Sequence, residues 1–202
     1  MKLVVATRNQ HKVREIAVLL AEAELAVEAV TIDEVAPTAE LREDEDTFEG
    51  NALAKARQAS AACSLPAIAD DSGIEVDALG GAPGVRSARW AGEPCDDGRN
   101  NEKMLRELSV VPATRRTARY RCAAAFVDVA RNVEVVRSGA CEGVLLGKAQ
   151  GTGGFGYDPL FFLPSLGRTM AEIDLVEKNR LSHRATAFRA LAQALRENFL
   201  KK

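Results

Sequence analysis

Hydrophobic and polar positions in the first half of the chain alternate between strand-like and helix-like patterns. Short apolar runs are typical of buried strands, whereas apolar residues spaced three and four apart indicate helices with one buried face. The acidic segment 33–46 shows no clear period and is expected to be a loop, and Thr47 after it is a plausible N-cap. Strands are therefore expected at 2–6, 25–30, 66–69 and 74–79, and helices at 13–20 and 48–63.

The second half is richer in consecutive strands. Arg131 and Asn132 suit a hairpin turn between two β-rich runs. Strands are expected at 118–129, 133–140 with an extension over 141–146, and 160–163, and helices at 101–108, 171–178 and 185–199. This order favours an α/β fold, a twisted mixed β-sheet with flanking helices and a small antiparallel extension. Residues 1–202 are expected to form one domain of two lobes with a ligand cleft between them.

Composition narrows the classes of ligand. The 202 residues are 47% hydrophobic and 28% charged, as in ordinary soluble proteins. The formal net charge of −2 provides no overall positive field to attract nucleic acid or a membrane surface. We therefore expect neither as a partner, and a small polyanion would have to meet a local group of basic side chains.

The cysteines, histidines and apolar segments further limit the kinds of metal site and the cellular compartment to be expected. The four cysteines include no CxxC pair and there are only two histidines, which argues against a zinc site of the usual kind. No apolar run reaches the length of about 18 residues that a membrane span needs, and the first residues lack the pattern of a signal peptide. A reduced, cytoplasmic protein is expected.

Residues 7–12, TRNQHK, lie where the first strand ends and the first helix begins. Backbone N–H groups and the positive end of the helix dipole make such a junction suitable for an anion. Thr7 and Asn9 can add hydrogen bonds, and Lys12 adds charge. Taken alone, the segment is better explained by Asn9 or Thr7 capping the helix, with Lys12 solvated.

Carboxylates gather in the sequence ADDSG at 69–73 and in the acidic loop before Thr47. Magnesium keeps several waters, so one or two carboxylates plus substrate phosphates are enough to bind it. Asp70 and Asp71, if both lie on a strand, point to opposite faces, so at most one meets a given metal. A capped turn explains the pair about equally well, and the acidic loop alone is typical of a solvated charge run.

The glycine-rich segment 151–158, GTGGFGYD, contains two aromatic residues, Phe155 and Tyr157. A ring beside flexible glycines can stack on a purine base. The segment lacks the GK[ST] ending of a Walker loop and the pattern of a dinucleotide-binding turn. Taken alone, a tight turn with core aromatics explains it slightly better.

The segment 177–184, EKNRLSHR, brings hydrogen-bond donors to the start of the last helix. Lys178, His183 and Arg184 are ligand candidates, whereas Ser182 suits the N-cap of that helix. No GxSxG nucleophile motif accompanies them, so a serine hydrolase is not indicated.

Together and in this order, these segments resemble the inosine/xanthosine triphosphate pyrophosphatase family, which acts on non-standard purine nucleoside triphosphates. The resemblance covers nearly the whole chain. Its motifs are T-x-N-x-x-K at 7–12, T-F-x-x-N-A-x-x-K at 47–55, A-D-D-S-G at 69–73, L-G-G-A-P-G at 79–84, S-A-R at 87–89, G-T-G-G-F-G-Y-D at 151–158 and S-H-R at 182–184.

The resemblance implies an elongated two-lobed α/β protein with a central substrate cleft, usually a homodimer. It implies a Mg²⁺-dependent hydrolase that converts ITP, dITP and XTP to the monophosphate and pyrophosphate, and so cleanses the nucleotide pool. The apolar hairpin and an exposed Trp90 are candidates for a twofold contact.

Site roles are transferred only where residues match. Asp71 matches the catalytic aspartate and metal ligand, and Glu43, four residues before Thr47, matches the second metal-binding carboxylate. Lys55 is expected to face the triphosphate, and Ser72 to contact the substrate. The other expected substrate-binding residues are Thr7, Arg8, Asn9, Gln10, His11, Lys12, Phe155, Gly156, Tyr157, Asp158, Lys178, His183 and Arg184.

One residue departs from the family pattern, and the choice of one metal-binding carboxylate stays open. Arg8 stands where the motif usually has a small residue, which puts the backbone geometry of the phosphate junction in doubt. The acidic loop offers several carboxylates besides Glu43, and its selection rests on spacing alone. The alternatives are Glu40, Asp44, Glu45 and Asp46.

The expected reaction is attack of water on the α-phosphorus, with pyrophosphate leaving. Asp71 would act as general base or position the water, and magnesium on Asp71 and Glu43 would offset developing charge. Lys12 and Lys55 would hold the triphosphate. A purine-nucleotide sensor without activity, or a phosphatase or transferase that cuts elsewhere among the phosphates, remains an alternative.

Selectivity is expected from hydrogen-bond matching at the base. Lys178, His183 and Arg184 are mainly donors, and a 6-oxopurine presents acceptors at O6 and N7. Adenine presents an amino donor at the same position, so a donor would face a donor. Inosine and xanthosine triphosphates are therefore expected to be preferred strongly over ATP.

Overall fold

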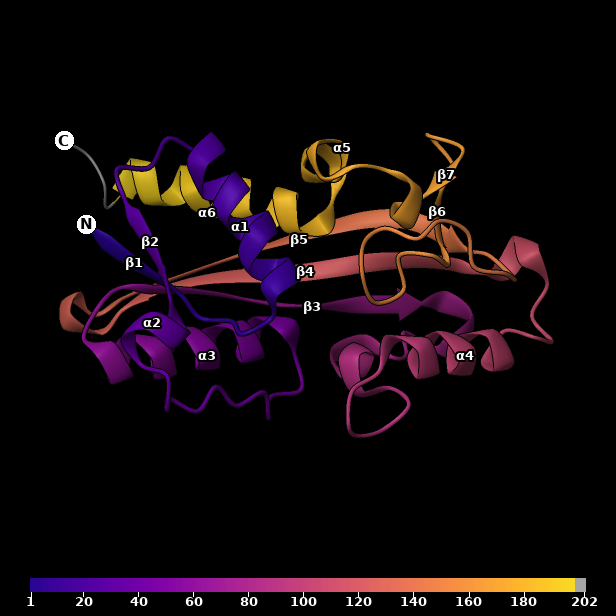
Figure 1. Cartoon of the computed structure of the whole chain (residues 1–202), viewed down its shortest axis with the longest axis horizontal. Coiled ribbons are helices and arrows are strands. Elements are labelled where there is room, and N and C mark those ends of the chain that lie inside the picture. Colours follow the sequence, from indigo (N-terminus) through magenta and orange to yellow (C-terminus); the bar gives the residue numbers. More distant parts are fainter. Residues whose placement is uncertain (199–202) are drawn as a thin grey trace. The chain divides into compact units, whose positions relative to one another are not determined.

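The computed structural model describes residues 1–198, so the expectation that the last helix reaches Phe199 lies outside the described part. Its strands are β1 (Lys2–Val5), β2 (Glu28–Thr31), β3 (Ala67–Val76), β4 (Thr117–Asp128), β5 (Val133–Leu145), β6 (Phe161–Leu163) and β7 (Arg168–Thr169). Its α-helices are α1 (Gln10–Glu22), α2 (Ile32–Val35), α3 (Phe48–Cys63), α4 (Asp97–Glu107), α5 (Leu175–Leu181) and α6 (His183–Asn198). Short 3₁₀ turns lie between some of these elements (Figure 1).

The strands form one hydrogen-bonded sheet in the order β2-β1-β3-β4-β5-β6-β7. β1 pairs in parallel with β2 and β3, whereas β6 pairs antiparallel with β5 and β7. The mixed sheet with flanking helices confirms the expected α/β class. None of the described helices is long and apolar enough to cross a membrane.

Two segments differ from the expected elements, apart from small shifts of boundaries. Residues 67–76 form one continuous strand, β3, so the expectation of two separate strands at 66–69 and 74–79 is wrong. The start of the expected loop 33–46 is helical, because Glu34 accepts a hydrogen bond from the Thr31 N–H (2.6 Å) and completes a capping box for α2. Two-residue β7 was also not predicted, since so short a strand leaves no period in the sequence.

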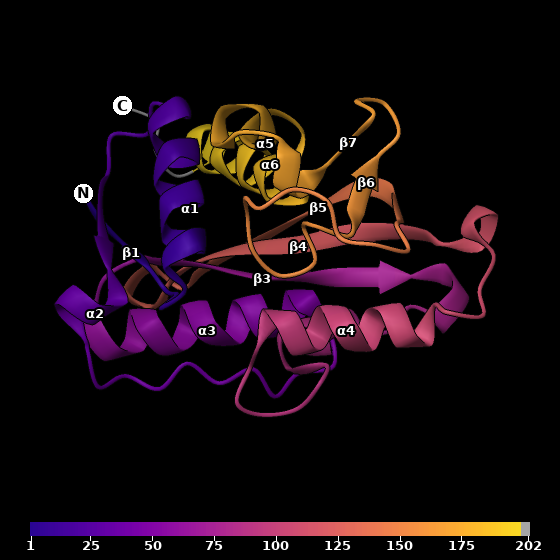
Figure 2. The ribbon, with the colours of Figure 1, turned by 45° about the vertical axis from the view of Figure 1, so that its right-hand side comes forward.

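The chain divides into two compact units, to both of which β3, β4 and β5 contribute residues. The first unit consists of Met1–Asp71, Cys122–Gly139 and His183–Lys202, described to residue 198. In this unit α1 and α6 cover one face of the sheet and α3 covers the other (Figures 1 and 2). Apolar residues at helical spacing form its core, for example Ile16 and Leu19 of α1 with Phe188 and Leu191 of α6.

The second unit consists of Ser72–Arg121 and Ala140–Ser182. In its core, Met104 of α4 joins residues of β3, β4 and β6, and the rings of Tyr120 and Phe161 lie 4.5 Å apart. Trp90 belongs to this unit and is half-buried, with Lys103 Nζ 3.9 Å from its ring centroid. The expectation of an exposed Trp90 is therefore wrong.

Candidate active site

The end of β1 and the start of α1 form a capped helix N-terminus. Asn9 Oδ1 accepts hydrogen bonds from the backbone N–H groups of His11 (2.9 Å) and Lys12 (3.2 Å). Buried Thr7 accepts one from the Asn9 N–H through Oγ1 (3.2 Å). Gln10 and His11 lie exposed in the first turn. Asn9 therefore caps the helix as expected, and the positive end of the helix dipole lies at this junction.

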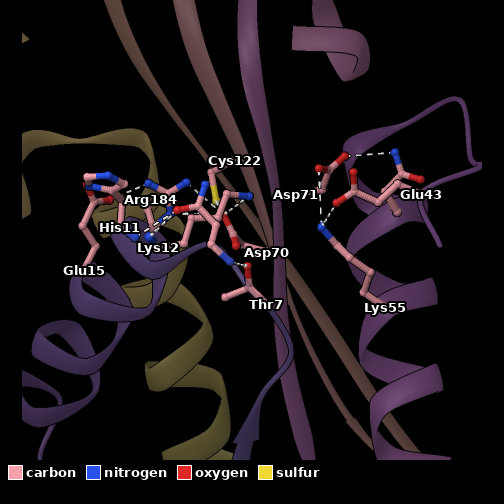
Figure 3. A network of polar contacts seen from close by, with 12 residues as sticks. Thr7, His11, Lys12, Glu15, Glu43, Lys55, Asp70, Asp71, Cys122 and Arg184 are labelled. Atoms are coloured by element: carbon pink, nitrogen blue, oxygen red, sulfur yellow. Dashed lines mark hydrogen bonds and ion pairs between the residues drawn. The ribbon is translucent and has the colours of Figure 1, made fainter. Parts of the chain in front are cut away.

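On the α1 and α6 side of β3, Lys12, Glu15, Asp70 and Arg184 form a buried charge cluster (Figure 3). Arg184 is 1% exposed, and its Nε and Nη2 donate to Asp70 Oδ2 at 3.1 and 3.0 Å. Its Nη1 donates to Glu15, and Lys12 Nζ lies 3.1 Å from the same oxygen of Asp70. Two cations thus meet two carboxylates in the interior.

Contacts within the charge cluster shift the pKa values of Asp70 and Arg184. Burial alone would raise the pKa of Asp70, but Lys12 and Arg184 outweigh burial and hold that pKa well below its usual range. Burial likewise disfavours the charged form of Arg184, yet Asp70 and Glu15 raise its pKa above the ordinary value. Asp70 and Arg184 therefore stay charged across the ordinary pH range.

These contacts differ from the expected donor set of Lys178, His183 and Arg184. Nε, Nη1 and Nη2 of Arg184 are all directed at the carboxylates of Asp70 and Glu15. His183 is buried at the first position of α6 in the same unit, whereas Lys178 belongs to the second unit. The role of Arg184 toward a purine base stays a prediction.

Asp71 points to the opposite face of β3 from Asp70, as the alternation of side chains along a strand predicted (Figure 3). On that face Lys55 of α3 donates to Glu43, and its Nζ lies 3.6 Å from Asp71 Oδ1. Asn51, one turn earlier on α3, donates from Nδ2 to Asp71 Oδ2 at 3.0 Å. Glu43, Asn51, Lys55 and Asp71 form what we call the carboxylate–lysine cluster.

The two carboxylates of this cluster differ in proton affinity. Burial raises the pKa of Asp71, and the opposing effects of Lys55 and Lys12 are too small to reverse it. Burial acts in the same direction on Glu43, but there the contact with Lys55 wins and the pKa is lowered. Lys55 itself has a raised pKa, because Asp71 and Glu43 outweigh its burial. Asp71 is thus the more basic carboxylate, as a general base requires.

Burial and contact distinguish Glu43 from the rest of the acidic loop. Glu43 is partly buried and meets Lys55, whereas the other four candidates, Glu40, Asp44, Glu45 and Asp46, are exposed. Glu43 and Asp71 supply hard carboxylate oxygens, which fit Mg²⁺ with its water and phosphate ligands. Among residues 1–198, no three or more His, Cys, Asp or Glu side chains are grouped to hold a metal.

In the second unit, Asp158 organises the glycine-rich segment. Its Oδ2 accepts hydrogen bonds from the Phe155 N–H (3.0 Å) and Lys178 Nζ (2.7 Å), and its Oδ1 accepts one from the Tyr120 hydroxyl (3.0 Å). Lys178 Nζ also lies 4.7 Å from the centroid of the Phe155 ring. Gly154 has a φ of 71°, and a Cβ there would lie 2.1 Å from the Asp158 carboxylate, so this turn requires glycine.

The remaining residues of this segment have different surroundings. Tyr157 is buried in the core and its hydroxyl donates to the Ser87 carbonyl at 2.8 Å, so the core-aromatic interpretation holds for it. Phe155 is only half-buried. Gly156 donates its N–H to Asp97 (2.6 Å) and accepts from the Asn101 side chain (2.8 Å). Ser72, partly buried, directly follows Asp71 on β3.

Sequence reasoning missed several polar residues that hold these clusters. Glu15 occupies the apolar face of α1, one turn before buried Leu19, and a charge at such a position was the available signal. Asn51 lies inside the motif at 47–55 but was not singled out. Tyr120 sits in an apolar strand pattern, where its hydrogen bond to Asp158 leaves no trace in the sequence.

Fold and clusters together define an α/β protein whose first unit gathers lysines and carboxylates suited to phosphate groups and a divalent cation. Comparison with known proteins agrees. The model of the Ham1 family matches residues 3–194, and the chain belongs to that family.

Relatives resemble the chain over almost their whole length. A dITP/XTP pyrophosphatase of Desulforamulus reducens is 46% identical over 200 residues, covering 99% of this chain and 98% of the relative. One of Geobacter sulfurreducens is 48% identical over 194 residues, 96% of each chain. The solved structure of a HAM1 protein from Coxiella burnetii is 36% identical with a TM-score of 0.88, covering 98% of this chain and 99% of that one.

Proposed function

We propose that this protein is a Mg²⁺-dependent pyrophosphatase that hydrolyses the deaminated purine nucleoside triphosphates ITP, dITP and XTP in the cytoplasm, and so cleanses the nucleotide pool. The products are the nucleoside monophosphate and pyrophosphate. The observation that supports the chemistry best is the convergence of Asp71 and Glu43 on Lys55. The substrate class is supported by the relatives, which are named dITP/XTP pyrophosphatases.

In the proposed reaction a water molecule attacks the α-phosphorus, and the bond from that phosphorus to the bridging oxygen of pyrophosphate breaks. Asp71 accepts the proton of the attacking water, for which its raised pKa is favourable. Lys55 and Lys12 present positive charge to the triphosphate and to the leaving pyrophosphate. Mg²⁺ held by Asp71 and Glu43 would offset charge on the phosphate oxygens.

The phosphate contacts rest on the start of α1. The positive end of the helix dipole favours an anion there, and Thr7, Asn9 and Lys12 surround the same turn. Asn9 and Thr7 already serve the cap, so they fix the geometry of the turn for a bound phosphate. Gln10 and His11, exposed in the same turn, complete the proposed phosphate segment, whereas the expected substrate contact of Arg8 stays a prediction.

Base recognition is proposed for the second unit. Phe155 is half-buried beside the ammonium of Lys178, a combination of an aromatic face and a donor. A 6-oxopurine offers acceptors to that donor, whereas adenine offers an amino group. Sites that depend on such hydrogen bonds reject the mismatched analogue by about 10⁴-fold. For His183 and Arg184, which belong to the first unit, the expected contact with a base stays a prediction.

Arg184→Ala separates the two roles open to that residue. If Arg184 donates to the base, the variant narrows the difference in kcat/KM between ITP and ATP. If Arg184 serves only the buried charge cluster, both substrates lose the same factor and the variant unfolds at lower urea concentration. Steady-state kinetics with both nucleotides, beside urea unfolding of the variant, give the answer.

One assay tests the proposed function against its alternatives. The purified protein is incubated with Mg²⁺ and ITP, and phosphate and pyrophosphate are measured separately. Equal amounts of IMP and pyrophosphate are expected, with turnover of ATP far slower. Release of inorganic phosphate would indicate a phosphatase instead, and nucleotide binding without turnover would indicate a sensor.

A further inference from the structure

Arg8 connects the phosphate junction to the segment that precedes α3. Its Nε donates to Asp33 Oδ1 at 2.9 Å. Its Nη2 donates to the backbone carbonyl oxygens of Pro37 (2.9 Å) and Ala39 (2.8 Å). One guanidinium therefore contacts Asp33 of α2 and two backbone carbonyls of the chain that leads from α2 toward Glu43. Arg8 itself lies between Thr7 and the N-cap Asn9, at the start of α1.

The segment 36–47 is also tied to α2 and to α3 by hydrogen bonds of its backbone N–H groups. The Arg42 N–H donates to Gln58 of α3 (2.7 Å), and the Glu45 N–H donates to Asn51 (2.9 Å). Glu43, between these two points, reaches Lys55. At the end near α2, the Ala36 N–H donates to the Ile32 carbonyl (2.8 Å), and Arg8 holds the two carbonyls just beyond it. Arg8 thus holds the chain before Glu43, and α3 holds the chain on both sides of Glu43.

We propose that Arg8 is a positioning residue, which holds the segment 36–47 so that Glu43 stays in the carboxylate–lysine cluster and is available to a divalent cation. This inference rests on the proposed function, which makes Glu43 a metal ligand. It departs from the expected role of Arg8 as a substrate-binding residue, since the hydrogen bonds of its Nε and Nη2 are made to the protein.

The chemistry of the contact suits arginine alone. The side chains of Arg8 and Asp33 are 42% and 46% exposed, so their ion pair by itself contributes little. The hydrogen bonds to the two carbonyl oxygens are charge-assisted and restrain the backbone directly. A lysine has a single nitrogen and cannot reproduce the planar fork that spans these acceptors.

Metal binding in the absence of nucleotide gives a readout that does not depend on turnover. Mn²⁺ is titrated into the full-length protein, and free Mn²⁺ is followed by electron paramagnetic resonance. Arg8→Ala is expected to raise the dissociation constant for Mn²⁺ about 5- to 10-fold, near the low end of what loss of an outer contact costs at a metal site. Arg8→Lys is expected to behave like Arg8→Ala.

Two further variants make the assignment specific. Arg42→Ala is a matched control in the same segment, because the Arg42 side chain is exposed and pairs only with exposed Glu40 among the contacts found. It should bind Mn²⁺ like the unmodified protein. In a Glu43→Gln background, Arg8→Ala should cause no further loss of Mn²⁺ affinity, because Arg8 acts through Glu43.

Kinetics with ITP distinguish failure of this inference from failure of the proposed function. Arg8→Ala should keep kcat at saturating Mg²⁺ within about twofold while needing more Mg²⁺ for half-saturation. A raised KM for ITP with unchanged Mn²⁺ affinity would make Arg8 a phosphate ligand and overturn the inference. Unchanged behaviour in every assay would overturn it too. An unmodified protein that neither binds Mn²⁺ nor hydrolyses ITP would refute the proposed function, and the inference with it.

Discussion

Two adjacent aspartates give the first unit its two kinds of chemistry. Asp70 faces α1 and α6, where Lys12 and Arg184 neutralise it in the interior. Asp71 faces α3, where burial raises its pKa and Lys55 only partly compensates. The same functional group is therefore a permanent anion on one face of β3 and a proton acceptor on the other.

Replacing Asp71 by Asn removes the proposed base and one metal ligand while keeping the size of the side chain. We expect kcat for ITP to fall by about 10²-fold or more. Asp71 must be unprotonated to act, and its pKa is raised above the ordinary aspartate value of 3.8. As the pH falls, the activity of the unmodified protein should therefore begin to decline before the pH reaches 3.8. A pH–rate profile measures this.

Asp44→Asn is the matched control for that experiment, since Asp44 is exposed in the acidic loop. It should leave both kcat and the pH profile unchanged. Normal turnover by a folded Asp71→Asn variant would refute the assignment of the base.

Asp70→Asn should instead damage the fold. It leaves Lys12 and Arg184 with one carboxylate fewer in the interior, and we expect the free energy of unfolding to drop by about 3–5 kcal/mol. The folded-state pKa of Asp70 is depressed, so its contribution is present above pH 3.8 and is lost as the pH falls through the folded value. Urea unfolding at several pH values should show the deficit of the variant shrinking below pH 3.8.

A double variant tests the origin of that deficit. Removing the cation together with the anion, as in Asp70→Asn with Arg184→Met, should cost less than the sum of the two single changes. Strict additivity would mean that the two side chains do not interact, against the contacts described.

At the scale of elements, periodicity predicted most helices and strands because each buries one face. Alternation along a strand also predicted that Asp70 and Asp71 point apart. The pattern did not show that the strand continues over 70–73, where a capped turn explained the two aspartates about equally well. The reason is tertiary: the strand continues because Lys12, Arg184 and Lys55 compensate the buried charges. No local pattern records those partners.

The candidate site shows the same limit. The motifs named most of the polar residues, but not their pairing. Arg184 meets Glu15 across 169 positions of sequence and Asp70 across 114. Such contacts depend on how α1, β3 and α6 pack together, so the pairing of Arg184 with Glu15 and Asp70 could not be predicted from the sequence.

Packing between β5 and α6 makes a sharp prediction at Gly139. A Cβ at this position would lie 2.4 Å from the His183 carbonyl oxygen and 2.6 Å from the Ala187 nitrogen, both of them backbone atoms. Gly139→Ala should therefore lower the free energy of unfolding by about 1–3 kcal/mol, as overpacking commonly does. Gly147→Ala is the control, because its Cβ would meet only the end of the Arg116 side chain. Equal stability of the two variants would contradict this account of the packing.

For the whole molecule, the expected homodimer remains a prediction. Multi-angle light scattering at micromolar concentration should give about twice the chain mass of 21.7 kDa. A mass near 21.7 kDa throughout a dilution series would refute the dimer. The half-buried position of Trp90 removes one of the two surface features on which the twofold contact was predicted.

The adjacency of the two aspartates in β3 has a consequence for mutation by insertion and deletion. A shift of one residue turns every side chain of a strand to the other face. Deleting Ala69 would move Asp71 into the place of Asp70 and Ser72 into the place of Asp71, which keeps a carboxylate in the buried charge cluster but removes the proposed base. Inserting one residue after Ala69 would put Asp70 in the place of the proposed base and remove the Asp70 carboxylate from Lys12 and Arg184. A change of a single codon within β3 therefore removes either the proposed base or a carboxylate of the buried charge cluster.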